Sequence, residues 1–318
     1  MIKRTIEISS GPTRLSVTHR QLVIEKSDGT QATIPIEDLG VVIVDHPAVN
    51  YTHAVFTDLL AAGAAIVLCS RDHHPTGIFL PIDAHSTQTE RHHCQIEATG
   101  PFKKQAWARV VRAKIERQAD VIQEVMGRDE GLRSLSTRVR SGDPDNLEAQ
   151  AAQRYWKVLF GKEFRRDRDG SGPNKALNYG YAIIRAAIAR AIAGSGLIPS
   201  LGLHHHNRSN PFCLADDLME PYRPFIDLKV SELVRSGHAL EELDRPAKSV
   251  LLSVLNETIQ IGDRRTPVGL AIHQTTASMA RGYETGKPQQ LDLPSSLFLR
   301  QRDLDLGSAL RPVDDRPG

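Results

Sequence analysis

The chain has 318 residues and an ordinary globular composition, with 40% hydrophobic residues, 25% charged residues and a formal net charge of +2 at pH 7. This length is sufficient for about two domains with a substantial core in each. No stretch approaches the roughly 18 apolar residues of a membrane span, and the N-terminal MIKRTIEISSG lacks the apolar segment of a signal peptide, so we expect a cytoplasmic protein with no membrane partner.

The first 95 residues are expected to form a small β-rich domain. Short segments rich in Ile, Val and Thr alternate with turn signals such as Asp28-Gly29, a pattern that is typical of strands. One helix is predicted within this domain, over residues 52–62. The predicted strands cover residues 4–9, 14–18, 21–25, 31–36, 41–44, 65–68 and 77–81.

The three cysteines, Cys69, Cys94 and Cys213, are an odd number and include no CxxC pair, so we expect no disulfide framework. A pair of histidines follows the first cysteine and another precedes the second, which could suggest a zinc site. Adjacent histidines usually point apart, however, and neither group has CxxC or HxxxH spacing. The sequence therefore does not favour zinc in this region.

Helices are predicted from Phe102 onwards. Apolar side chains recur at helical spacing between residues 102 and 126, and the opposite face of that helix is basic. Residues 101–190 contain 19 Lys or Arg against 11 Asp or Glu, a local charge of +8, whereas the rest of the chain sums to −6. We therefore expect the middle of the chain to contact a polyanion. The basic face of the helix comprises Lys103, Lys104, Arg109, Arg112, Lys114 and Arg117.

A second helix is predicted from about Asn146 to Phe160, after the capping sequence SGDPDN. Glu148 lies in its first turn, where a carboxylate usually serves only to offset the helix dipole. The charged, Gly-rich segment that follows, residues 164–175, is predicted to be a surface loop. The arginines of this loop are Arg165, Arg166 and Arg168.

The remainder is predicted to be mostly helical and to end in a polar, disordered tail over residues 301–318. Residues 178–192 are strongly apolar and are expected to form a central packing helix. We therefore predict an α+β fold, in which a β-rich domain of residues 1–95 precedes a larger all-α domain of residues 96–300. Further helices are predicted over residues 225–234, 248–256 and 267–283, and a strand over residues 258–261.

Residues 201–227 contain a dense group of histidines and carboxylates. A helix that begins near Leu214 would place Asp217 and Glu220, and also Asp216 and Glu220, on one face. Like charges so placed repel unless a cation lies between them, and a hard divalent cation accepts carboxylate oxygens together with an imidazole. A solvated acidic helix face beside surface histidines is the alternative. The group comprises His204, His205, His206, Asp216, Asp217, Glu220 and Asp227.

Several motifs resemble, in order and over nearly the whole length, those of the CRISPR adaptation integrases (the Cas1 family), in a form like that of type II systems. Each motif alone is weak, whereas this many in one order is specific. The resemblance implies a β-rich dimerisation domain followed by a helical catalytic domain. The motifs are Asn146-Leu147-Glu148, Leu177-Asn178-Tyr179-Gly180-Tyr181, Gly202-Leu203-His204-His205, Asn210-Pro211-Phe212 and Asp217-Leu218-Met219-Glu220-Pro221-Tyr222-Arg223-Pro224.

The resemblance implies a catalytic metal triad, which falls on Glu148, His205 and Glu220. It gives Asp217 a supporting place at the site, and it favours His205 over His204 as the histidine that faces the metal, with His204 as a supporting residue. The implied activity is that of a metal-dependent DNA endonuclease and integrase that inserts short DNA, called spacers, into a repeat array. The implied partners are a second copy of the chain, a dimer of the smaller protein Cas2 and, in type II systems, the large effector nuclease and a further adaptation protein.

An open, oxygen-rich site without sulfur suits Mg²⁺ or Mn²⁺ better than Zn²⁺. Such an ion would help to deprotonate and position the 3′-OH of a DNA end and would neutralise the charge that develops on the attacked phosphate. We expect Arg223 to pair with the nearby carboxylates. Basic side chains would hold the phosphates of duplex or branched DNA without distinguishing bases; they are Lys103, Lys104, Arg109, Arg112, Arg165, Arg166 and Arg168.

Two other functions are compatible with the residues alone. A metal-dependent phosphohydrolase that acts on nucleotides would use the same acidic and histidine residues, but it gives no role to the basic middle of the chain. A non-catalytic DNA-binding scaffold would use the basic residues and leave Glu148 as a helix cap. Loss of turnover on replacing Glu148 separates both enzymes from the scaffold, and salt-sensitive binding of branched DNA separates the integrase from the phosphohydrolase.

Overall fold

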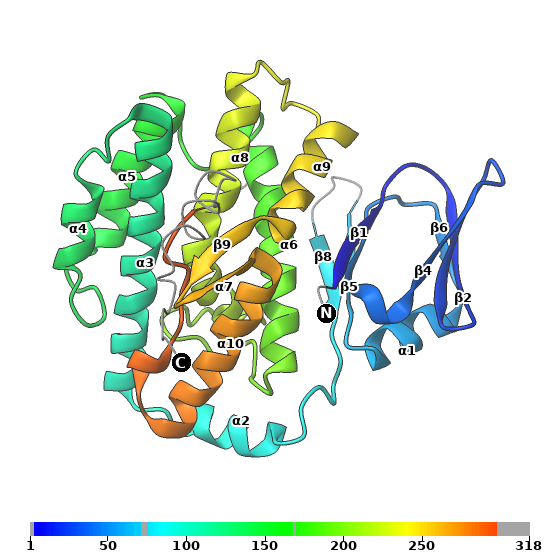
Figure 1. The fold of residues 1–318 in the computed structure, drawn as a ribbon, viewed down its shortest axis with the longest axis horizontal. Coiled ribbons are helices and arrows are strands. Elements are labelled where there is room, and N and C mark those ends of the chain that lie inside the picture. The colour runs from blue at the N-terminus through cyan, green and yellow to red at the C-terminus, as the bar shows by residue number, and fades with distance from the viewer. Residues whose placement is uncertain (1–2, 71–74, 168–169, 298–318) are drawn as a thin grey trace, which may run out of the picture.

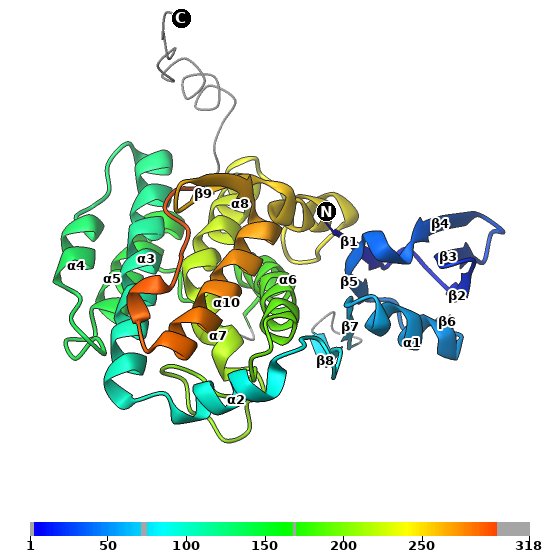
Figure 2. The ribbon, with the colours of Figure 1, turned by 60° about the horizontal axis from the view of Figure 1, so that its bottom comes forward.

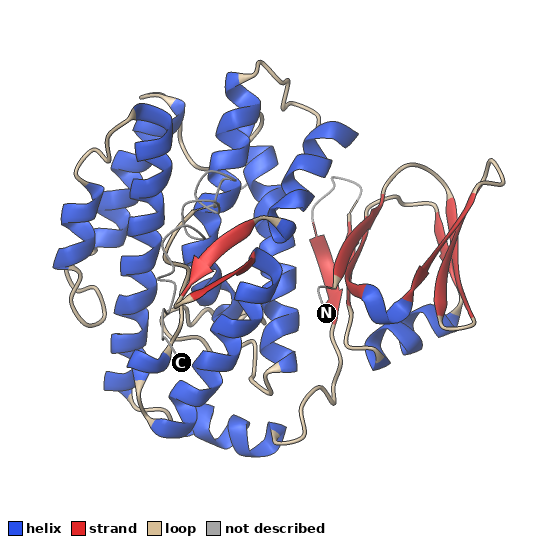
Figure 3. Ribbon diagram, viewed as in Figure 1, coloured by secondary structure: helices blue, strands red, loops and turns tan. Residues whose placement is uncertain are grey.

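The computed structural model describes residues 3–70, 75–167 and 170–297 of the chain. A strand-rich N-terminal part lies beside a larger and mostly helical C-terminal part (Figures 1 and 3). This arrangement confirms the predicted α+β class. The predicted disordered tail, residues 301–318, lies outside the described residues.

Two sheets form the N-terminal part, and both are visible at the right of Figure 2. The first has the strand order β1 (Arg4–Ile8), β5 (Leu39–Val44), β7 (Ala65–Cys69) and β8 (Pro75–Phe79). The second has the order β4 (Gln31–Pro35), β3 (Gln21–Lys26), β2 (Thr13–Thr18) and β6 (Val49–Tyr51). The helix α1 (His53–Ala61) links the second sheet back to the first, and the short helix η1 (Ile36–Asp38) precedes β5.

The apolar strand β5 joins the two parts of the molecule. All its residues are buried, as expected for a strand covered on both faces. Val41 and Ile43 belong to the core that the helical part shares, whereas Val42 and Val44 belong to the core between the two sheets and α1. Because successive side chains of a strand point to opposite faces, one sequence, VVIV, contributes to both cores.

The C-terminal part is built around two long helices, α3 (Gly100–Met126) and α6 (Pro173–Gly194) (Figure 1). No helix in the described ranges combines the length and hydropathy that a membrane crossing requires. The other helices are α2 (Gln88–Glu97), α4 (Leu132–Arg138), α5 (Leu147–Phe160), α7 (Cys213–Met219), η2 (Glu220–Tyr222), α8 (Arg223–Arg235), α9 (Arg245–Ser253), η3 (Val254–Asn256), α10 (Val268–Thr285) and η4 (Pro288–Gln290). A hairpin of β9 (Thr258–Ile261) and β10 (Arg264–Pro267) precedes α10.

The helix α2 was not predicted, and the expected domain boundary at residue 95 falls inside it. Its sequence, QTERHHCQIE, is polar and has no apolar stripe, so the usual helical signal is missing. Contacts with the helical part hold it instead: the Gln95 amide bonds to the backbone of Ile198 and Leu201, and Arg91 pairs with Glu284 of α10 at 2.7 Å. The structure therefore places α2 with the helical part.

The central helix α6 begins at Pro173, five residues before the predicted start. Proline is tolerated in the first turn of a helix because its missing N–H would have no partner there. The predicted loop before it is correspondingly shorter. The short elements β6, α4 and β10 were also not predicted, whereas the longer helices and most strands lie where the residue patterns placed them.

Candidate metal centre

Glu148 is positioned by the start of α5. The preceding turn places the Asp143 carboxylate against the first backbone amides of the helix, and Asp143 accepts hydrogen bonds from the N–H groups of Leu147 and Glu148, both at 3.0 Å. The sequence SGDPDN therefore has the predicted capping chemistry, with Asp143 as the capping residue. Since Asp143 already caps the helix, the Glu148 side chain is free to point towards α3.

Glu220 begins the single turn η2, directly after α7. Pro221 lacks the N–H that would continue an α-helix, which is consistent with the change of helix type at this point. The Glu220 side chain is 5% exposed, and its Oε1 lies 3.0 Å from Nε of Arg223. Arg223 therefore pairs with this acidic segment, as predicted. Burial opposes the charge of Glu220, but Arg223 and Lys114 hold its pKa below the ordinary value.

Asp217 organises the histidine loop. Its carboxylate is completely buried and accepts hydrogen bonds from the backbone N–H groups of Leu203, at 2.5 Å, and His204, at 3.0 Å. Its Oδ1 also lies 2.6 Å from Nδ1 of His205. Because these donors occupy its oxygens, Asp217 orients His205 through Nδ1 of the imidazole. Nε2 is then the ring nitrogen that is available for a ligand.

The hydrogen bond from His205 to Asp217 raises the pKa of His205, although burial opposes this. His204 lies elsewhere: its ring stacks on Trp107 of α3, with centroids 4.5 Å apart and planes inclined by 4°. The ring of His205 is nearly perpendicular to the same indole, with centroids 5.9 Å apart and planes inclined by 85°. Trp107 therefore contacts both histidines, and His204 covers its face.

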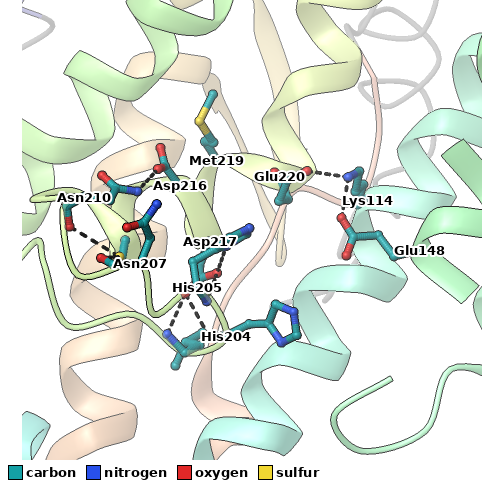
Figure 4. A network of polar contacts seen from close by, with 12 residues as sticks. Lys114, Glu148, His204, His205, Asn207, Asn210, Asp216, Asp217, Met219 and Glu220 are labelled. Carbon is teal, nitrogen blue, oxygen red and sulfur yellow. Dashed lines mark hydrogen bonds and ion pairs between the residues drawn. The ribbon is translucent and has the colours of Figure 1, made fainter. Parts of the chain in front are cut away.

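The other two carboxylates of the acidic segment have separate partners. Asp216 pairs with Arg185 of α6 at 2.6 Å and accepts a hydrogen bond from Asn210, so it does not join Glu220 as the helical spacing predicted (Figure 4). Asp227 of α8 is buried and accepts hydrogen bonds from Tyr155, at 3.0 Å, and from Tyr181. Burial raises the pKa of Asp227 to about 7, although both tyrosines act in the opposite direction. This network joins α5, α6 and α8 around the site.

Glu148 and Glu220 meet at Lys114 of α3. The ammonium nitrogen lies 2.6 Å from Glu148 Oε1, to which it donates a hydrogen bond, and 2.5 Å from Glu220 Oε2 (Figure 4). The second contact has the distance of an ion pair but not the geometry of a hydrogen bond, so the buried Glu220 Oε2 accepts no hydrogen bond. Burial opposes the charge of Lys114, but the two carboxylates raise its pKa above the ordinary value.

The side chains present fit a hard divalent cation. Two carboxylates converge, one buried carboxylate oxygen lacks a hydrogen-bond donor, and His205 has one ring nitrogen left over. In the residues that the structure describes, however, no three His, Cys, Asp or Glu side chains lie close enough together to hold a metal ion. The ammonium of Lys114 lies between Glu148 and Glu220, the two carboxylates that would help to hold such an ion.

Lys114 and Trp107 were missed as site residues. They are seven residues apart on α3, about two helical turns, and so lie on one face of the helix. Lys114 lies three residues after Val111 and four before Gln118, and Val111 lies four after Trp107. This spacing places Lys114 in the buried stripe of the helix, and all four residues are buried. Because a lysine is almost never fully buried unless it is paired, this spacing alone predicts carboxylates opposite it.

The predicted basic face of α3 requires correction. Lys114 and Arg117 do not face solvent: both are buried, and Arg117 bonds to Asp120 at 2.7 Å and to the carbonyl of Pro294 at 2.6 Å. Lys104 and Arg112 are exposed, although Arg112 also donates to the carbonyl of Val139.

The remaining candidates for DNA contact differ in exposure. Lys103 and Arg109 are partly exposed, and Arg109 donates a hydrogen bond to the carbonyl of Leu291 at 3.0 Å. Arg165 is exposed, whereas Arg166 is held by Asn174 and Asn178 of α6. Arg168 lies outside the described residues. The most accessible cations of this set are therefore Lys104, Arg112 and Arg165, with Lys103 partly so.

Comparison with known proteins agrees with the motifs. The family model of the CRISPR associated protein Cas1 matches residues 6–254. The chain is 38% identical over 304 residues to the CRISPR-associated endonuclease Cas1 of Neisseria meningitidis serogroup C, covering 95% of this chain and 99% of that protein.

Two solved structures have a similar fold at low sequence identity. A casposase bound to integration product has a TM-score of 0.75 and 16% identity, over 96% of this chain and 99% of the casposase chain. A chain of a Cas6-RT-Cas1–Cas2 complex has a TM-score of 0.73 and 15% identity, over 94% of this chain and 36% of that chain. Both likenesses concern the fold.

Proposed function

Because the chain belongs to the Cas1 family of CRISPR-associated proteins, we propose that it is a metal-dependent DNA endonuclease and integrase that inserts spacers into a repeat array by 3′-OH transesterification. The observation that supports this most strongly is the convergence of Glu148, from α5, and Glu220, from η2, on the ammonium of Lys114. Carboxylates so far apart in sequence gain nothing from mutual proximity unless a cation lies between them.

Glu148, Glu220 and Nε2 of His205 would hold Mg²⁺ or Mn²⁺. When bound, the ion would stabilise the charge that develops on the attacked DNA phosphate and favour deprotonation of the 3′-OH. Asp217 fixes the ring of His205 through Nδ1, and Trp107 limits its rotation by edge contact. Arg223 compensates the negative charge of Glu220 inside the buried part of the site.

We propose DNA as the substrate because exposed or partly exposed cations lie on α3, the helix that contributes Lys114, and in the loop before α6. Lys103, Lys104, Arg112 and Arg165 would contact phosphates without reading bases. Two fold neighbours, a casposase bound to integration product and a chain of a complex that contains Cas1 and Cas2, support the proposal of an integration reaction and a Cas2 partner. We further propose a cytoplasmic homodimer formed through the N-terminal part and, for a type II system, association with the effector nuclease and a further adaptation protein.

A branched DNA that mimics an integration intermediate tests this function. We expect the purified protein with Mn²⁺ to rejoin or cleave the branch without a nucleotide cofactor, and a chelator to stop the reaction. Binding should weaken steeply as salt rises, because several phosphate contacts release counterions. Phosphate release from free nucleotides with no action on DNA would support the phosphohydrolase instead. Salt-sensitive binding without turnover would support the scaffold.

A further inference from the structure

Lys114 lies between the two carboxylates of the candidate site, although it was expected on the basic face of its helix. It extends from α3 between the carboxylates of two other chain segments, and its side chain is 11% exposed. Both of its close partners, Glu148 and Glu220, are the carboxylates proposed to bind metal. Among the described residues, the Lys114 ammonium is therefore the group that contacts the acidic side chains of both segments.

The three charges depend on one another. Without Lys114, Glu148 would face the buried Glu220, and Arg223 would remain paired with the other oxygen of the Glu220 carboxylate. Removal of one partner from a buried ion pair leaves an uncompensated charge, which is strongly destabilising. Lys114 therefore keeps the two carboxylates turned towards each other when no metal is present.

A divalent cation needs the same oxygen atoms. Mg²⁺ binds carboxylate oxygen at about 2.1 Å in a nearly fixed octahedral arrangement. The Lys114 ammonium already lies 2.6 Å from Glu148 Oε1 and 2.5 Å from Glu220 Oε2. A metal ion held by the same two oxygens would therefore have to occupy the small volume that the ammonium now fills. Two cations at that separation repel strongly, since the buried surroundings screen them little.

We propose that Lys114 is a resident counter-ion, which holds Glu148 and Glu220 in place in the metal-free protein and withdraws from them when the divalent ion binds. Lys114 is thus a positioning residue that sets how tightly the site binds metal. The inference rests on the proposed metal-dependent function, because it assumes that these two carboxylates are the metal ligands.

Mn²⁺ titration of the full chain, followed by electron paramagnetic resonance of the free ion, tests the proposal without any DNA. We expect Lys114→Met, which keeps the length of the side chain but removes its charge, to bind Mn²⁺ about tenfold more tightly or better, because the ion no longer displaces an ion pair. Lys114→Arg keeps the charge and should show no such gain. Lys104→Met, on an exposed part of the same helix, controls for a general loss of positive charge.

Thermal unfolding gives a second readout in the same variants. The metal-free Lys114→Met protein should melt below the parent, and saturating Mn²⁺ should raise its melting temperature by more than it raises that of the parent. Equal or weaker Mn²⁺ binding by Lys114→Met than by the parent overturns the inference and leaves the metal site standing. Absence of Mn²⁺ binding in the parent and every variant overturns the metal site itself, and the inference with it.

The parent protein provides a test that does not depend on how the variant folds. Reductive methylation of lysines, quantified by mass spectrometry, should modify Lys114 slowly in the metal-free protein because its ammonium is buried and paired. We expect Mg²⁺ to accelerate the modification of Lys114 while the rate at Lys104 stays constant. Unchanged or slower modification of Lys114 with bound Mg²⁺ would contradict its withdrawal.

Discussion

Glu148→Gln, His205→Ala and Glu220→Gln should each reduce Mn²⁺-dependent cleavage or rejoining of branched DNA by about a thousandfold or more, because loss of one charge-stabilising group at a reacting centre typically has effects of this order. The three residues come from α5, the loop after α6, and η2, and none of them belongs to the hydrophobic core. The measurement is the rate of branch resolution at saturating Mn²⁺, with binding of the same DNA measured separately.

Asp216→Asn is the matched control for these variants. Asp216 lies four residues before Glu220 but pairs with Arg185 and Asn210; the single amide oxygen of asparagine, at the position of Oδ2, can still accept from Nη2 of Arg185 and from Asn210, and only the bond from Nε of Arg185 is lost. This variant should therefore keep most of the parental activity. Parental rates in all three triad variants would show that the site has been assigned to the wrong residues.

Gly202→Ala should lower the activity by about a hundredfold although Gly202 contacts no DNA or metal in the proposed reaction. A Cβ atom at this position would lie 2.5 Å from the carbonyl oxygen of His205 and 2.7 Å from Oδ2 of Asp217. Both the loop and the carboxylate that position His205 would have to move, and a shift of about 1 Å at a reacting group can lower a rate by about a hundredfold. Branch resolution with Mn²⁺ measures the effect.

Gly194→Ala is the control for this substitution, since a Cβ atom there meets nothing within 4 Å. It should change neither the rate nor the melting temperature appreciably. If Gly202→Ala retains the parental rate, the close packing of the histidine loop on Asp217 is not what positions His205, and that part of the account is wrong.

The fold class followed from local patterns. The apolar run of β5 and the amphipathic pattern of α3 are strong signals because burial on one or two faces dictates where apolar residues recur. The polar helix α2 has no such pattern and depends on the bonds that Gln95 makes to a segment about a hundred residues away. Contacts of that kind are not visible in a single sequence.

The sequence predicted the candidate metal ligands of the site. It did not predict which cations pair with them. Motif resemblance directed attention to Glu148, His205 and Glu220, and these remain predictions as metal ligands. The prediction that Lys114 and Arg117 lie on a basic face of α3, opposite its apolar residues, failed because the helix is buried on more than one side. Lys114 and Arg117 contact η2 and the segment at Pro294, which come late in the chain. Only the folded arrangement shows which cations have carboxylate or carbonyl partners.

Asp217 illustrates the same limit. Helical spacing placed it beside Glu220 and suggested that both could bind one cation. In the structure its carboxylate is enclosed by the backbone amides of the histidine loop, so its lone pairs are already engaged. The loop residues between Leu201 and Asn210 have no periodic pattern from which this wrapping could be inferred.

A crystal of the full chain soaked in Mn²⁺, with anomalous diffraction recorded at the manganese edge, tests the central claim most directly. We expect one strong anomalous peak between the carboxylates of Glu148 and Glu220 and within coordination distance of His205 Nε2, with the Lys114 ammonium moved off both carboxylates. A peak on other residues, while Lys114 still bridges Glu148 and Glu220, would contradict the metal centre described above.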